Sequence, residues 1–145
     1  EKRVADLFGK RLGLFVNSGS SAILLGLCAL DLPKGSEVVT PACGFATTVA
    51  PLMQLGLKPV FCDVGINSYV PTVEDLKKVV TPDTKCLLIP NLIGNIPDWP
   101  AIREAFPDLI LFEDSADTIT CTPCRWYPIR LEVPIWCSWV SSKGL

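Results

Sequence analysis

The 145-residue chain contains no histidine, which excludes, within the chain, every mechanism that needs an imidazole, such as a Ser-His-Asp triad. It has no run of Lys or Arg, and its net charge is −2, so we expect no nucleic-acid partner. No apolar run reaches the roughly 18 residues that span a bilayer, and no leader-like segment is recognisable. These absences favour a soluble, cytoplasmic protein with no membrane partner.

Seven cysteines are present, an odd number, and most stand singly in apolar runs, as in Leu27-Cys28-Ala29 and Phe61-Cys62-Asp63. Free cysteine in such a place behaves as a small buried hydrophobe, so we expect reduced thiols and no disulfide framework. Cys121 and Cys124 have the two-residue gap of a zinc or redox pair. Because only Cys137 lies nearby as a third ligand, we expect no metal site.

Short apolar runs alternate with helix-like segments along most of the chain. Such runs indicate strands that are buried on both faces, and their alternation with helices indicates a mostly parallel sheet. We therefore predict a three-layer α/β/α fold with one core. Its predicted helices cover residues 1–9, 22–30, 44–55, 73–80 and 99–106, and its predicted strands cover 12–16, 37–40, 59–62, 86–89 and 109–112.

Two of the predicted helices carry distinctive sequences. The helix over 22–30 is apolar on every side, so it needs cover on both faces, which the sheet can provide on one and a second domain or subunit on the other. Thr72 and Asp75 form a capping-box pattern ahead of the helix over 73–80, whose Lys77 and Lys78 favour the carboxyl end of a helix dipole.

The segment Asn17-Ser18-Gly19-Ser20-Ser21-Ala22 precedes and begins the apolar helix. Serines in this place are commonly N-caps that bind nothing. One cap needs only one hydroxyl, however, and three serines with a glycine let an oxyanion approach the unpaired amides of the first turn. The segment is either a plain cap or a phosphate site, and it matches neither a P-loop nor a Gly-x-Gly-x-x-Gly motif.

Two further segments bring groups to the same edge of the predicted sheet. Phe45 stands at the head of a helix, either as a core residue or as a platform for a flat ring. Thr47 and Thr48 add hydroxyls to that turn, as a polar pocket floor requires. Asp114 follows a buried apolar run, and ligands of open α/β sheets collect at the carboxyl ends of strands. A buried acid needs a cationic or hydrogen-bonded partner, and a protonated pyridine nitrogen is such a partner.

Three other polar positions follow predicted strands. Asp117 lies close enough in sequence to Asp114 to reach the same edge. The segment over 91–95 is either a simple turn or part of a pocket lining, and Asp63 has the same two interpretations.

In these segments the sequence closely resembles the DegT/DnrJ/EryC1/StrS family of pyridoxal-phosphate nucleotide-sugar aminotransferases and their dehydratase relatives. The resemblance implies part of the large domain of a type I, aspartate-aminotransferase-like fold. It also implies a nucleotide-sugar substrate and an active site shared across a homodimer. It runs from about Val4 to Thr118 and is carried by residues 16–22, 35–42, 56–64 and 113–117.

The resemblance implies roles around pyridoxal 5′-phosphate (PLP) or its amine form (PMP). Ser20 and Ser21 would hold the phosphate and Phe45 would stack on the ring. Asp114 would pair with the pyridine nitrogen, and Asp117 would lie near the ring hydroxyl. Aminotransferases of the family carry Gln or His at the position of Asp117. The acid here resembles instead the 3-dehydratase branch, which makes 3,6-dideoxyhexoses for lipopolysaccharide.

The family places its Schiff-base lysine, or the histidine that replaces it in the dehydratases, some tens of residues beyond the Asp114 motif. Lys143 lies at about that distance in a similar context, Ser-Ser-Lys-Gly. The Gly-rich segment that the family carries in between is missing, so we assign no catalytic residue. We divide the chain into a partial PLP-binding domain over 1–121 and an irregular tail over 122–145.

The tail has the period of neither a helix nor a strand. Residues 126–130, Trp-Tyr-Pro-Ile-Arg, can be encoded by TGG TAC CCC ATC CGG, which reads Gly-Thr-Pro-Ser-Gly from the second base. That has the family's Gly-x-x-x-Gly spacing. Our hypothesis is that the tail is an out-of-frame translation, which the nucleotide sequence tests.

The sequence as a whole predicts a fragment of a PLP-dependent enzyme acting on nucleotide-linked 4-keto-6-deoxy sugars. The reaction is either aminotransfer or C3 dehydration, in lipopolysaccharide or deoxysugar biosynthesis. One alternative is a catalytically inactive binding or scaffold domain with this fold. Another is a truncated product with no function.

Overall fold

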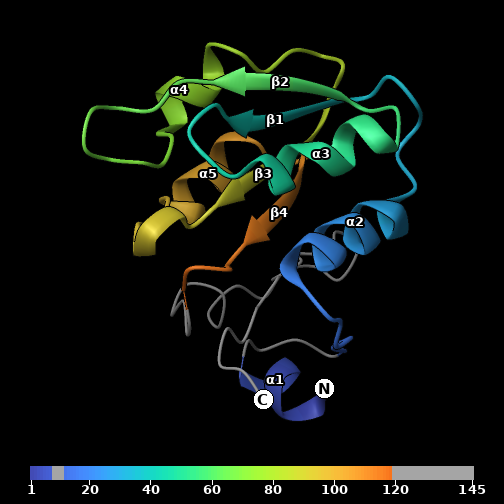
Figure 1. Cartoon of the computed structure of the whole chain (residues 1–145). Coiled ribbons are helices and arrows are strands. Elements are labelled where there is room, and N and C mark those ends of the chain that lie inside the picture. The colour runs from blue at the N-terminus through green and yellow to red at the C-terminus, as the bar shows by residue number, and fades with distance from the viewer. Residues whose placement is uncertain (8–11, 119–145) are drawn as a thin grey trace.

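A computed structural model describes residues 1–7 and 12–118. Its centre is a four-stranded, all-parallel sheet with the strand order β2-β1-β3-β4. The arrows point the same way in Figure 1, so the carboxyl ends of the strands meet at one edge of the sheet. The strands are Glu37–Pro41 (β1), Lys58–Cys62 (β2), Thr84–Pro90 (β3) and Ile110–Asp114 (β4).

Helices cover both faces of this sheet (Figure 1), which confirms the predicted three layers. They are Gly19–Leu30 (α2) and Ala46–Gln54 (α3) on one face and Val73–Lys77 (α4) and Trp99–Ala105 (α5) on the other, with a 3-10 turn at Leu92–Gly94 (η1). Helix Lys2–Leu7 (α1) lies apart from the sheet (Figure 1). Among the described residues, no helix has both the length and the apolar character needed to cross a bilayer.

The core is divided by the sheet because successive residues of a strand point to opposite faces. In β1, Val38 packs with the cluster that contains Leu27 of α2 and Leu52 of α3. Its neighbour Val39 packs with the cluster that contains Ile102 of α5. All five side chains are buried, and each such burial is worth about 1.5–3 kcal/mol.

The described residues cover helix α2 on one side only. Ile23 and Leu27 are buried against the sheet, as predicted, whereas Leu25 is 45% exposed. Cys28 is also exposed, so its expected burial was wrong: it lies on the side of α2 that the sheet does not reach. Cover of this side by a second domain or subunit stays a prediction.

The other described cysteines fit the expectation of free thiols. Cys62 and Cys86 are buried, and Cys43 is half-buried. No disulfide joins any of the four cysteines in the described part of the chain. Cys121, Cys124 and Cys137, like the whole predicted tail, lie outside the described residues.

The predicted strand over 12–16 was wrong. These residues are irregular, with Leu12 83% and Phe15 61% exposed. An apolar run becomes a strand only beside a strand that it can pair with, and none of the four described strands pairs with it. Strand β2 forms as predicted, but as an edge strand, and Phe61 on it is therefore half exposed.

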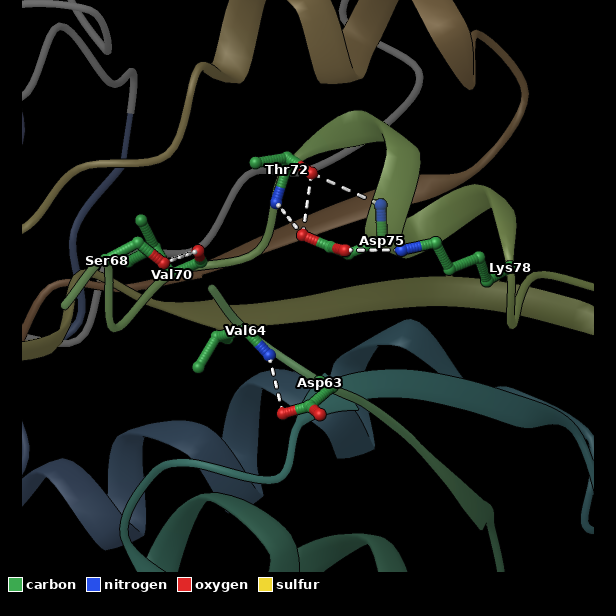
Figure 2. Close-up of polar contacts among 7 residues, drawn as sticks. All are labelled: Asp63, Val64, Ser68, Val70, Thr72, Asp75 and Lys78. Atoms are coloured by element: carbon green, nitrogen blue, oxygen red, sulfur yellow. Dashed lines mark hydrogen bonds and ion pairs between the residues drawn. The ribbon is translucent and has the colours of Figure 1, made fainter. Parts of the chain in front are cut away.

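Helix α4 begins with the predicted capping box (Figure 2). The Thr72 hydroxyl accepts a hydrogen bond from the Asp75 N–H at 3.2 Å, and Asp75 Oδ2 accepts one from the Thr72 N–H at 3.1 Å. Lys78 Nζ lies 2.9 Å from the other carboxylate oxygen of Asp75. The helix ends at Lys77, earlier than its apolar pattern suggested.

Candidate active site

Asp114 is the last residue of β4, and its side chain is buried at the carboxyl edge of the sheet, with 6% exposed. Its Oδ2 accepts a hydrogen bond from the Thr48 hydroxyl at 3.2 Å, and its Oδ1 accepts one from the Ala116 N–H at 3.2 Å. The predicted buried and hydrogen-bonded acid is therefore present. Thr48 is buried as well, whereas Thr47 is exposed, so only one of the two hydroxyls forms part of a polar floor.

A pocket of about 260 Å³ opens beside Thr48, between the start of α3 and the carboxyl ends of the strands. Phe45 and Phe61 both line it, and they are 62% and 50% exposed, so Phe45 is not a core residue. Phe61 has no polar motif around it in the sequence and was not foreseen. The full lining is Thr40, Pro41, Ala42, Gly44, Phe45, Ala46, Thr48, Val49, Phe61 and Pro90.

The serines stand at the start of α2. Ser18 is the N-cap: its Oγ accepts a hydrogen bond from the Ser21 N–H at 3.1 Å and lies 3.1 Å from Ser21 Oγ. Ser20 is exposed, so the cap does not consume all of the hydroxyls. The first amides of a helix have no partner within it. A cap and an anion site are therefore compatible in this segment.

The topology brings the start of α2 toward the strand ends. Helix α2 ends at Leu30, a short turn before β1 begins at Glu37, so the helix runs back against the strand direction. Figure 1 shows the beginnings of α2 and α3 on the side toward which the arrows point. Ser20 and Ser21 nevertheless do not line the 260 Å³ pocket.

Asp117 is exposed and, like Asp114, is not among the residues that line that pocket. Its Oδ2 accepts a hydrogen bond from the Ile93 N–H at 2.9 Å. Ile93 has a φ of 53° and a ψ of 36°, a left-handed conformation that is strained for a β-branched residue. The segment over 91–95 is thus a turn, which was the first of its two predicted interpretations. It contacts Asp117 and does not line the 260 Å³ pocket.

A buried polar cluster around Asn91, at the carboxyl ends of β3 and β4, was not foreseen from the sequence. Asn91 is completely buried, and its Nδ2 lies 2.6 Å from Glu113 Oε1 and 3.1 Å from Ser115 Oγ. A signal was available, since an asparagine inside the apolar run Pro90-Asn91-Leu92 needs partners when it is buried. Their identity was not readable, because they lie more than twenty residues away.

Asp63, a remaining candidate, contributes nothing to this arrangement. Asp63 is exposed, and Figure 2 shows its Oδ1 turned to the adjacent Val64 N–H, 2.9 Å away. Within residues 1–7 and 12–118, no group of three or more cysteine and carboxylate side chains is placed to hold a metal ion. Lys143 lies outside the described residues.

The sequence model of the DegT/DnrJ/EryC1/StrS aminotransferase family matches residues 1–123. The chain belongs to this family. A family relative, dTDP-4-dehydro-2,6-dideoxy-D-glucose 3-dehydratase of Saccharopolyspora spinosa, is 39% identical over 132 residues, which are 84% of this chain and 29% of the relative. A second relative from that organism, dTDP-4-dehydro-2,3,6-trideoxy-D-glucose 4-aminotransferase, is 36% identical over 105 residues, which are 71% of this chain and 27% of the relative.

The fold agrees with solved structures of the DegT/DnrJ/EryC1/StrS family. GDP-4-keto-6-deoxy-D-mannose-3-dehydratase of E. coli, solved with hydrated PLP, superposes with a TM-score of 0.78 at 38% identity. The match covers 82% of this chain and 33% of that enzyme. The described residues therefore form part of a type I PLP-dependent fold, and the chain spans about a third of the length of the relatives it matches.

Proposed function

We propose that this chain is part of the large domain of a PLP-dependent enzyme that acts on nucleotide-linked 4-keto-6-deoxy sugars. The enzyme works in the cytoplasm, as a homodimer, in lipopolysaccharide or deoxysugar biosynthesis. The observation that carries the proposal is the buried Asp114 carboxylate, held by Thr48 at the carboxyl edge of the sheet. A carboxylate fixed in this way stabilises a positive charge placed against it.

The residues present fit PLP or PMP. The exposed Phe45 ring at the pocket has a free face on which a flat ring can stack. Ser20 and Ser21 stand at a helix N-terminus, where unpaired amides and the helix dipole favour a phosphate. Asp114 would accept a hydrogen bond from the protonated pyridine nitrogen, and Asp117 would lie near the ring hydroxyl.

Each of these groups has a separate task in the chemistry. PLP, when bound, supplies an electron sink for the reacting carbon of the substrate. Asp114 maintains that property by keeping the pyridine nitrogen protonated, and Thr48 keeps the carboxylate in place. The helix N-terminus fixes the cofactor by its phosphate, and Phe45 covers one face of the ring against water.

Dehydration at C3 is favoured over aminotransfer by the acid at position 117, where the aminotransferases of the family carry Gln or His. The chain supplies no histidine, and Lys143 is not assigned as the Schiff-base residue. We therefore expect the chain alone to bind the cofactor without turning over a nucleotide sugar.

Binding of PMP to the chain tests the proposal. PMP carries the ring and the phosphate but has no aldehyde that could react with surface lysines. We expect saturable quenching of PMP fluorescence by the chain. Phe45→Ala and Asp114→Asn should each weaken it roughly tenfold, as expected for loss of about 1.4 kcal/mol. Met53→Ala is the control for Phe45, since Met53 is 64% exposed on the same helix and lies outside the pocket lining.

Three outcomes would contradict the proposal or the expectation for the chain alone. A folded chain that does not bind PMP would be a scaffold of the family fold without the cofactor. A chain that neither binds PMP nor unfolds cooperatively in urea would be a truncated product. PLP fixed onto Lys143 by borohydride, with turnover of a nucleotide sugar, would show a complete enzyme instead.

A further inference from the structure

Asn91, where the chain leaves β3, contacts the Asp114 segment at several points. Its Nδ2 lies within hydrogen-bonding distance of Glu113 Oε1 (2.6 Å), Ser115 Oγ (3.1 Å) and Thr118 Oγ1 (3.3 Å). Its own Oδ1 accepts a hydrogen bond from Trp99 Nε1 at 3.3 Å. One buried amide thus links the core of α5 to the turn that follows β4.

The backbone adds a further link at the same place. The Asn91 N–H donates to the Asp114 carbonyl oxygen at 2.9 Å. The side chain and backbone of Asn91 together therefore contact Asp114 and the residues on both sides of it, Glu113 and Ser115.

These contacts reach Asp114 from the face of the sheet opposite to its carboxylate. Leu111 of β4 packs in the cluster with Trp99, and Glu113, two residues on, points to that same face. Asp114 points to the other face, where Thr48 of α3 holds its Oδ2. The acid is thus held by its side chain from one face and by its neighbours from the other.

The arrangement includes a buried carboxylate, that of Glu113, which needs hydrogen-bond donors. Its carboxylate is 1% exposed, and Oε1 accepts hydrogen bonds from Asn91 Nδ2 and from Ser115 Oγ, each at 2.6 Å. A buried carboxylate that loses a donor moves toward another one or draws in water. Because Glu113 adjoins Asp114 in the chain, such a movement displaces the Asp114 backbone.

We propose that Asn91 is a positioning residue, which clamps the turn from Glu113 to Thr118 and thereby sets the place of the Asp114 carboxylate against the ring nitrogen of the cofactor. The proposal rests on the proposed function for its ligand, and on the hydrogen bonds of the chain itself for its geometry. A group of this kind acts through the residue that it orients and does not touch the cofactor.

The test compares Asn91→Leu, which keeps the size of the side chain and removes its polar atoms, with Asn95→Leu. Asn95 is half-buried in the same segment, and among the described residues its side chain donates only to the local Leu92 carbonyl, at 2.9 Å. PMP with an isotopically labelled ring nitrogen is bound to the full chain, and its NMR chemical shift reports whether the nitrogen is protonated. Affinity is measured in parallel by PMP fluorescence.

We expect a protonated ring nitrogen at neutral pH in the unchanged chain and in Asn95→Leu. In Asn91→Leu the signal should move toward the neutral pyridine, and affinity should fall about tenfold, while phosphate contacts still retain the ligand. If Asn91→Leu only lowers the stability of the fold and leaves the nitrogen signal unchanged, its role is structural and the proposal is wrong. If Asn91→Leu does not fold, Thr118→Val removes one of the acceptors of Asn91, and it should shift the signal in the same direction by less.

A measurement without ligand separates this proposal from the proposed function. The Ala116 N–H donates to Asp114 Oδ1 at 3.2 Å, so its hydrogen-exchange rate reports the place of the carboxylate. We expect faster exchange in Asn91→Leu and unchanged exchange in Asn95→Leu. Equal rates in all three chains would overturn the positioning role, whereas failure of the unchanged chain to bind PMP would overturn only the proposed function.

Discussion

Thr48 on α3 donates its hydroxyl hydrogen to Oδ2 of Asp114 at the end of β4, over 3.2 Å and across a separation of 66 residues in sequence. Both residues are buried, with 2% and 6% of their surfaces exposed. This contact links α3, whose N-cap is Phe45, to β4, which ends at Asp114. The two halves of the candidate cofactor site are thereby held in one place.

Thr48→Val should damage both the fold and the site, because it keeps the shape of the side chain and removes the donor. A hydrogen bond to a charged group is worth about 1.5–3 kcal/mol. We expect the free energy of unfolding in urea to fall by about that amount and PMP affinity to fall roughly tenfold or more. Thr47→Val, at an exposed position of the same turn, should change neither, and equal effects of the two variants would contradict this account.

The capping box of α4 should make stability depend on acid pH. The Thr72 hydroxyl, and after it Lys78, lower the pKa of Asp75 to about 2. Because the pKa of Asp75 is lower in the folded state than in the unfolded state, the ionised carboxylate stabilises the fold at pH values above the ordinary Asp pKa of about 4. This contribution is lost as the pH falls from there toward 2.

Asp75→Asn should therefore flatten the acid limb of a plot of unfolding free energy against pH. Glu104→Gln, on the exposed surface of α5, should leave that limb unchanged. Thr72→Ala removes the other half of the box and should cost about 0.5–2 kcal/mol at neutral pH. If the acid limb of Asp75→Asn is as steep as that of the unchanged chain, Asp75 does not cause the acid dependence of stability.

The thiols should react in an order set by burial. Burial raises the pKa of Cys62 to about 11 and that of Cys86 to about 12, so neither is a thiolate at neutral pH. Of the four described cysteines, exposed Cys28 should be alkylated by iodoacetamide first, and half-buried Cys43 more slowly. Peptide mass mapping should find Cys62 and Cys86 labelled only in denaturant, and labelling of Cys86 in the folded chain would contradict its burial in the core.

A second polar cluster, at the amino end of β1, should limit stability at both extremes of pH. Glu37 Oε1 lies 2.8 Å from Lys58 Nζ, and Glu37 Oε2 accepts a hydrogen bond from the Thr81 hydroxyl. Lys58 in the first place and Thr81 in the second lower the pKa of Glu37, and Glu37 in turn raises the pKa of Lys58.

The two shifts act at opposite ends of the pH scale. The Glu37 contribution is present above the ordinary carboxyl range and is lost as the pH falls. The Lys58 contribution is present below the ordinary lysine range and is lost as the pH rises past it. Glu37→Gln should therefore flatten the acid limb and Lys58→Met the alkaline limb, and added salt should weaken the effect of Lys58→Met because the Lys58 side chain is 65% exposed.

Most of the sheet was predictable because its strands differ from their surroundings in composition. β3 and β4 are apolar runs with polar flanks, and burial on both faces requires such runs. The residues over 12–16 have the same composition, but none of the strands in the described part of the chain pairs with them, so the same rule failed there. A strand depends on its partner, and a single segment does not encode that partner.

For the candidate site, the sequence itself determined the kinds of groups and their place at strand ends and helix starts. A carboxylate at the end of β4, serines at the start of α2 and an aromatic ring at the head of α3 all follow from local pattern. Tertiary structure alone decided which groups meet: Thr48 with Asp114, and Asn91 with Glu113. These pairs are separated by 66 and 22 residues, and hydrogen bonds over such separations form only when packing of the helices against the sheet brings the segments together.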